Sequence, residues 1–146
     1  MTNIRSLICL LTGHVDHGKS QIIESISETK IIEKEAGKIT QSIYAVNVSM
    51  DKIEKISGKL LDNIKSKIKI PGFLLIDSPG HAAFSNLRKR GGSIADIAIV
   101  VVDANEGLME QTKEAIEILK KYKTPFIIAL NKIDNISGWK SNNNLG

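Results

Sequence analysis

The feature that most constrains this chain is a loop near its start, Gly13-His14-Val15-Asp16-His17-Gly18-Lys19-Ser20, with the spacing G-x-x-x-x-G-K-[ST]. An apolar run precedes the loop and a helix pattern follows it, as in loops that bind phosphate between a strand and a helix. The glycines let backbone N–H groups surround phosphate oxygens, and the start of the helix adds its positive dipole end. Lys19 would reach the β- and γ-phosphates, and the Ser20 hydroxyl would bind Mg²⁺. The loop therefore predicts a nucleoside triphosphate site on an α/β fold.

The apolar residues around this loop alternate between strand-like and helix-like patterns. Continuous apolar runs, typical of strands buried on both faces of a parallel sheet, occupy residues 7–11, 73–76, 97–102 and 126–130. Helix patterns occupy residues 19–27 and 111–121, the second with charged residues opposite its apolar side. Strands that alternate with helices predict right-handed βαβ units. We therefore expect a three-layer α/β/α sandwich around a mostly parallel sheet.

Residues 51–68 carry apolar side chains at steps of three and four, which predicts a helix with one apolar face. Gly58 interrupts the pattern and marks a possible break. We expect this helix to pack on the sheet, and the alternative is a groove for a partner protein.

Composition excludes several classes of protein. The chain is 42% hydrophobic and 25% charged, unlike disordered or membrane proteins, and it lacks the ~18 to 20 consecutive apolar residues of a membrane span. The single cysteine, Cys9, allows no internal disulfide, which favours the cytosol, and its apolar neighbours predict an inert core thiol. The net charge of +4 is weak evidence for nucleic acid, because the lysines are scattered.

Two further motifs follow predicted strands directly. Asp77-Ser78-Pro79-Gly80-His81 places a carboxylate where α/β sheets bind ligands, and that carboxylate can hold the metal through a water. By itself this motif could also be a simple turn. Asn131-Lys132-Ile133-Asp134 follows the last strand, and its final carboxylate can accept from two N–H groups of guanine that adenine does not offer together. In this order along the chain, the motifs indicate a guanine nucleotide.

Together these segments resemble the translational GTPases. The similar stretches are GHVDHGKS, EAGKITQSI, DSPGHAAFSNLRKRGGSIAD, VDANEGLMEQTKEAI and NKID, and they extend from residue 4 to residue 139. The stretch AFSNLRKRGG is similar to the archaeal and eukaryotic relatives of bacterial translation initiation factor two rather than to the elongation factors. The resemblance implies a P-loop GTPase (Ras-like) sandwich that hydrolyses GTP to GDP with Mg²⁺ when the ribosome docks it.

The resemblance also assigns roles to residues. His81 is similar to the histidine that orients the attacking water, and Val15 and Ile39 are similar to the apolar gate through which it passes. The metal ligands are expected to be Ser20, Thr40 and Asp77. We expect His14 and His17 to contribute backbone groups and no imidazole chemistry. The residues expected to bind nucleotide are Gly13, His14, Val15, Asp16, His17, Gly18, Lys19, Ser20, Gln21, Asp77, Ser78, Pro79, Gly80, His81, Asn131, Lys132, Ile133 and Asp134.

The chain departs from the family's pattern mildly at Lys38, Ser78 and Ala82, and more deeply at its end. We expect residues 1–146 to form an incomplete GTP-binding domain without the last strand and helix, which would leave an apolar edge at residues 126–130. The resemblance implies a cytoplasmic monomer that contacts the ribosome, no membrane, and initiator transfer RNA bound through absent domains. Two alternatives stay open, a non-catalytic nucleotide-binding fragment and another translational GTPase, either an elongation factor or a selenocysteine factor.

Overall fold

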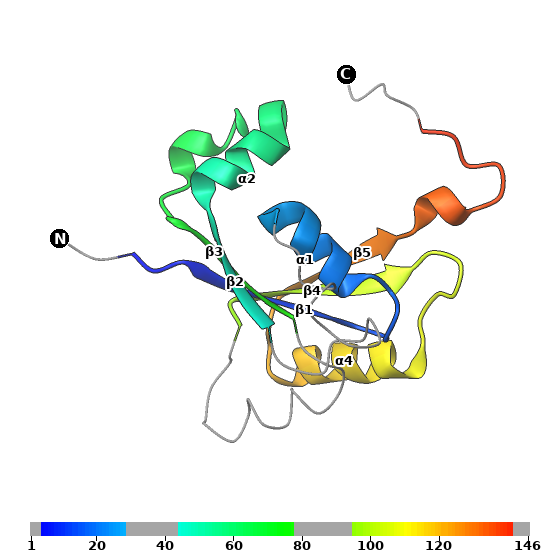
Figure 1. Cartoon of the computed structure of the whole chain (residues 1–146). Helices are drawn as coiled ribbons and strands as arrows, with labels where there is room; N and C mark the ends of the chain where they lie inside the picture. Colours follow the sequence, from blue (N-terminus) through cyan, green and yellow to red (C-terminus); the bar gives the residue numbers. More distant parts are fainter. Residues whose placement is uncertain (1–3, 29–43, 78–94, 142–146) are drawn as a thin grey trace.

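The computed structural model describes residues 4–28, 44–77 and 95–141. Within these residues the strands form one mixed sheet in the order β2-β3-β1-β4-β5 (Figure 1). The strands are β1 (Leu7–Gly13), β2 (Tyr44–Ser49), β3 (Gly72–Asp77), β4 (Ile97–Asp103) and β5 (Phe126–Asn131). All four predicted strands are confirmed, each with one or two additional residues. Their neighbours pair in parallel, as expected, and β2 is antiparallel to β3.

The parallel register brings the carboxyl ends of four strands to one edge of the sheet. Leu11 of β1 lies opposite Asp77 of β3, and Gly13 lies opposite Val101 of β4. Asp103 at the end of β4 pairs with Asn131 at the end of β5. The loops that follow β1, β4 and β5 therefore begin next to one another.

Helices cover both faces of the sheet, so the three-layer sandwich is confirmed. Helices α1 (Lys19–Ser27) and α2 (Met50–Ser57) lie on one face and α4 (Glu110–Lys121) lies on the other (Figure 1). The first interface buries Ile23 of α1 completely, in a cluster with Leu11 of β1 and Leu75 of β3. The second interface buries Ala115 and Leu119 of α4. Both predicted helices are present, and α4 begins one residue earlier than expected.

The sequence patterns missed strand β2, although a signal for it exists. Tyr44, Val46 and Val48 turn toward the core, and the residues between them are exposed. This alternation with a period of two is typical of a strand with one covered face. Continuous apolar runs do not reveal this strand, because such runs mark strands that are buried on both faces.

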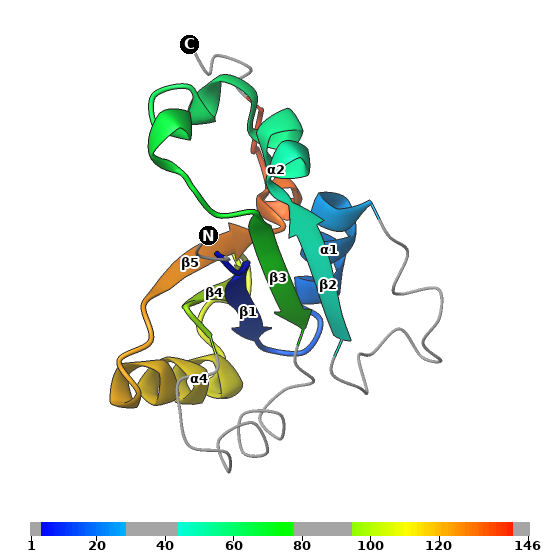
Figure 2. The same cartoon turned by 90° about the vertical axis from the view of Figure 1, so that its left-hand side faces the viewer.

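The single packed helix predicted over residues 51–68 is wrong. Helix α2 ends at Ser57, and two short 3-10 helices follow, η3 (Gly58–Leu61) and η4 (Lys65–Lys67) (Figure 2). Gly58 ends the helix with a φ of 50°, a conformation that costs glycine little. Because the backbone turns there, later apolar residues do not continue the face that Ile53 presents to the core. The side chain of Leu60 is 75% exposed.

Two smaller expectations are met. Cys9 is buried, and burial raises the pKa of its thiol to about 11, so it is an unreactive core residue. β5 lies at an edge of the described sheet with Ile127, Ile128 and Leu130 more than half exposed.

Among the described residues, no helix combines the length and the apolar character needed to cross a membrane.

One ion pair ties the beginnings of β1 and β4 together. Arg5 donates two hydrogen bonds to the Asp96 carboxylate, at 2.7 and 2.8 Å. The backbone N–H of Ile8 donates to the same carboxylate at 2.8 Å, and the Asp96 N–H donates back to the Ile8 carbonyl. The guanidinium of Arg5, followed by the Ile8 N–H, lowers the pKa of Asp96 to about 2.

We expect the change Asp96→Asn to destabilise the chain at neutral pH and to have no effect in strong acid. A folded-state pKa below the ordinary value of ~3.9 means that the carboxylate stabilises the fold above pH ~4. This stabilisation is lost as the pH falls through about 2. Because the pair is partly solvated, the free energy of unfolding should fall by only about 1 kcal/mol at pH 7. Urea unfolding from pH 7 to about pH 1 measures this, with Asp62→Asn as the control, and a difference that does not vary with pH would contradict it.

Candidate functional site

The residues predicted to bind nucleotide gather at the carboxyl edge of the sheet. The phosphate-binding loop begins where β1 ends at Gly13, and Asp77 is the last residue of β3. The Asn-Lys-Ile-Asp segment begins at the end of β5 and continues into the 3-10 helix η5 (Ile133–Asn135). Three segments that are far apart in sequence therefore converge on one site, as the parallel register requires.

Two glycines of the loop have backbone conformations in which any other residue would be strained. Gly13 has a φ of 141°, and a Cβ atom there would collide with the backbone carbonyl of Val101 on β4. Gly18 has a φ of 88°, and a Cβ atom there would collide with the side-chain amide of Asn131. Helix α1 begins at the next residue, so its first N–H groups point into the loop. The loop is therefore a concave backbone surface with a helix N-terminus behind it, which suits an anion.

Lys19 lies folded within this loop. Its ammonium donates to the backbone carbonyls of Gly13 at 3.2 Å and His14 at 2.8 Å, and its side chain is buried. Burial lowers the pKa of Lys19, and the carboxylates of Asp77 and Asp16 oppose that shift. The cation is therefore held inside the loop, where an incoming phosphate would give it oxygens to bind.

Ser20 and Asp77, two of the three residues predicted to bind the metal, lie within hydrogen-bond distance of each other. The Ser20 hydroxyl donates to a carboxylate oxygen of Asp77, which is completely buried at the end of β3. A hydroxyl and a carboxylate are oxygen ligands of the kind that Mg²⁺ prefers, usually with phosphate oxygens and water completing the shell. In the described part of the chain no group of three His, Cys, Asp or Glu side chains could hold a metal by itself.

The base-side segment is bonded to the phosphate-binding loop. The Asn131 side-chain amide donates to the His17 carbonyl at 2.9 Å, as predicted for a residue that joins base and loop. Lys132 has a left-handed backbone, with φ 57°, and its ammonium pairs with Asp103 at 2.9 Å. The hydrogen bond from Lys132, followed by that from the Asn105 N–H, lowers the pKa of Asp103 to about 2. Asp134 is exposed on η5, so its carboxylate is accessible to a base.

The His17 side chain makes structural contacts that the sequence patterns do not indicate. Its imidazole is completely buried, with Nδ1 3.3 Å from the Val101 carbonyl and Nε2 3.0 Å from the Glu106 carboxylate. The His14 ring packs edge-on against it, with ring centres 5.1 Å apart. The sequence patterns missed Asp103 and Glu106 as partners of the site. Their one signal is their position directly after a buried strand, where α/β proteins bind ligands.

The remaining predicted residues divide into two groups. Val15 is half-buried, whereas Asp16 and Gln21 are exposed around the loop. The other predicted positions, which include the expected catalytic histidine, lie outside the described residues: Ile39, Thr40, Ser78, Pro79, Gly80 and His81.

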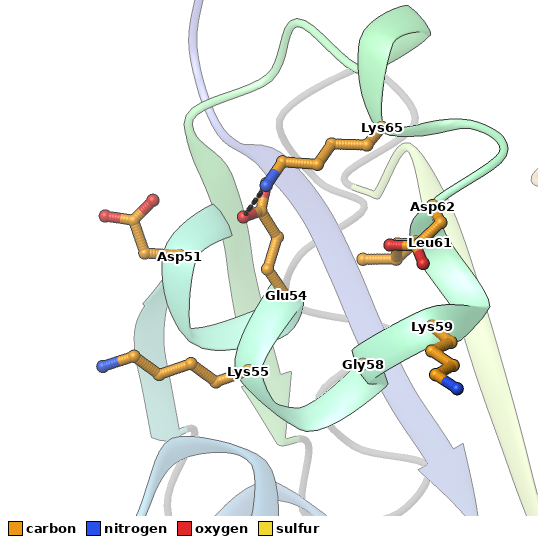
Figure 3. Close-up of a pocket in the computed structure, with 8 residues that line it drawn as sticks. All are labelled: Asp51, Glu54, Lys55, Gly58, Lys59, Leu61, Asp62 and Lys65. Carbon is orange, nitrogen blue, oxygen red and sulfur yellow. Dashed lines mark ion pairs between the residues drawn. The ribbon is translucent and has the colours of Figure 1, made fainter.

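A hollow of about 660 Å³ lies between α2 and η3 (Figure 3). It is at the other end of the sheet, since residues 50–71 connect the end of β2 to the beginning of β3. Three carboxylates and three lysines line it, and the Lys65 ammonium forms an ion pair with the Glu54 carboxylate at 2.8 Å. Its equal numbers of both charges and its distance from the converging loops separate it from the candidate site.

The chain is similar to translation factors in sequence. Residues 4–145 match the elongation factor Tu GTP binding domain family. The probable translation initiation factor IF-2 of Thermococcus sibiricus is 55% identical over 140 residues, which are 96% of this chain and 24% of that protein. The corresponding protein of Methanopyrus kandleri is 51% identical over 138 residues, or 94% of this chain and 23% of that protein. This chain therefore spans about a quarter of the length of these relatives.

Solved structures of translation factors are also similar to this chain. The crystal structure of GDP-bound aIF5B from Aeropyrum pernix is 54% identical, with a TM-score of 0.75, over 96% of this chain and 23% of that chain. A bacterial selenocysteine-specific elongation factor, EF-Sec, is 25% identical, with a TM-score of 0.67, over 92% of this chain and 21% of that chain.

We expect Lys19→Ala to weaken GTP binding on the order of 10²-fold, because the buried ammonium would lose charge-assisted bonds to phosphate oxygens. Titration of the chain with a fluorescent GTP analogue measures this. Lys55→Ala, which removes an exposed lysine on α2, is the matched control and should bind as the unmodified chain does. Equal affinity in the two variants would refute the assignment of Lys19.

Proposed function

Because the chain belongs to the elongation factor Tu GTP-binding domain family, we propose that it binds and hydrolyses GTP as the G domain of an archaeal-type translation initiation factor. The observation that carries this proposal is the hydrogen bond from Asn131 to the His17 carbonyl, which joins the base-side segment to the phosphate-binding loop. The identity of 54% to an initiation factor structure, against 25% to a selenocysteine-specific elongation factor, favours initiation.

GTP would lie across the carboxyl edge of the sheet. Its phosphates would bind the N–H groups of residues 13–20 and draw the Lys19 ammonium away from the loop carbonyls that it bonds now. Its guanine would meet Asp134, whose exposed carboxylate accepts from the ring N–H and the exocyclic amine. The GDP-bound state of the Aeropyrum pernix relative supports a guanine nucleotide as the ligand.

Ser20 and Asp77 fit a Mg²⁺ ion that accompanies the nucleotide. The Ser20 hydroxyl would turn from the Asp77 carboxylate to the ion, and Asp77 would hold the ion through a water. By resemblance, Thr40 would complete the shell. Bound Mg²⁺ supplies positive charge that neutralises charge on the β- and γ-phosphate oxygens.

Hydrolysis transfers the γ-phosphoryl group of GTP to a water in line with the leaving oxygen. Lys19 would stabilise the charge on that oxygen, and His81 would orient the water after passing between Val15 and Ile39. In the intact factor, docking on the ribosome would complete this arrangement, and other domains would bind initiator transfer RNA. A monomer in the cytoplasm suits these roles.

The identity of the base is tested by Asp134→Asn. Xanthine has a carbonyl where guanine has its exocyclic amine, so the change from acceptor to NH₂ donor should reverse the preference. Loss of a charged pair of hydrogen bonds shifts the ratio of the two affinities on the order of 10²-fold or more. The affinities for xanthosine and guanosine triphosphates are measured side by side, with Asp51→Asn at the far end of the sheet as the control. A ratio that stays constant would show that Asp134 does not contact the base.

The role of His81 is tested in the intact factor with His81→Ala. We expect unchanged GTP affinity, because the imidazole acts on the water, and at least about a 10²-fold loss of ribosome-stimulated turnover. Single-turnover hydrolysis with and without ribosomes separates these effects. Normal stimulated turnover would mean that another group positions the water.

A further inference from the structure

The loop after β4 makes a side-chain contact with the phosphate-binding loop. Glu106, in the loop between β4 and α4, is 89 residues away from His17 in sequence, and the two side chains meet at 3.0 Å. The Glu106 side chain is half-exposed, whereas the His17 imidazole has no exposed surface. The glutamate therefore extends from the surface to the Nε2 atom of a buried ring.

The surroundings of this ring make the glutamate more than a chance neighbour. The Val101 carbonyl at Nδ1 can only accept a hydrogen bond, and an ionised carboxylate at Nε2 can also only accept. Each ring nitrogen therefore lies within hydrogen-bond distance of an oxygen from a different segment, and the two contacts together fix the orientation of the ring. A buried ring that lost this partner would keep a desolvated polar atom, which is costly.

His17 is held by its backbone as well as by its side chain. Its carbonyl accepts from Asn131 at the end of β5, while its ring bonds to Val101 of β4 and to Glu106 beyond it. The next two residues are Gly18 and Lys19, where the loop becomes helix α1. The N–H groups of these residues are the donors that would contact phosphate, so the position of His17 fixes their direction.

We propose that Glu106 is a positioning residue for nucleotide binding. It holds the His17 imidazole in place and so keeps the phosphate-binding loop in the form that accepts the β-phosphate of GDP or GTP. The inference rests on the proposed function, because it concerns the same guanine nucleotide. Glu106 itself does not contact the nucleotide, and its loss should make the loop reorganise at each binding event.

The test is the rate at which the chain releases a fluorescent GDP analogue. We expect Glu106→Ala to release it about tenfold faster than the unmodified chain, which corresponds to ~1.4 kcal/mol. The matched control is Glu110→Ala, an exposed glutamate on α4 that pairs with Lys113, and it should release GDP at the unmodified rate. The melting temperature of the nucleotide-free Glu106→Ala chain should fall by only a few degrees, because one nitrogen of a buried ring loses its partner. A fall of more than about 10 °C would mean that the change destabilises the whole chain, and this outcome would contradict a positioning role.

A double-mutant cycle tests whether Glu106 acts through His17. If it does, Glu106→Ala combined with His17→Ala should release GDP within about twofold of His17→Ala alone. If the two changes instead multiply each other's effect on the rate of GDP release, the inference is overturned. Should His17→Ala not fold, the comparison of Glu106→Ala with Glu110→Ala decides by itself. If the unmodified chain does not bind GDP, the proposed function and this inference both fall. If it binds GDP and Glu106→Ala releases it at the unmodified rate, only the inference falls.

Discussion

The parallel pairing of β3, β1, β4 and β5 is the constraint on which the rest of this molecule depends. Parallel strands end at the same edge, so loops far apart in sequence must begin side by side. The hydrophobic cores on the two faces fix the strands and thereby the ends of the strands. The geometry of the site is therefore a consequence of burying apolar residues on both faces of one sheet.

At that edge, the buried polar groups need hydrogen-bond partners, because buried polar atoms without hydrogen bonds are costly. Their partners are groups in the loops that begin there. Lys19 bonds loop carbonyls, Ser20 bonds Asp77, and Lys132 pairs with Asp103. These bonds leave a preformed concave loop, which lowers the cost of ordering when a phosphate binds. The groups that satisfy one another here are also those that a metal ion and a nucleotide could take over.

Much of the fold could be predicted because its signals are local. Continuous apolar runs gave four strands to within two residues, and helical periodicity together with the loop motif gave α1 and α4. Strand β2 lies at the sheet edge with one covered face, so its signal is an alternation and not a run. The prediction of one continuous helix over residues 51–68 failed for another reason. Periodicity assumes a continuous helix, and the backbone turn at Gly58 redirects later side chains, so Leu60 faces solvent.

By itself the sequence determined the phosphate-binding loop, the carboxylate at the end of β3 and the base-side segment, because each depends on residue types at fixed spacing. Only the tertiary structure decided which side chains join them. The burial of the His17 ring, its contact with Glu106 and the pairing of Lys132 with Asp103 connect residues 29 to 89 positions apart. No local pattern encodes such pairs. They exist because parallel strands place distant loops within hydrogen-bond distance, and because buried charges then require a partner.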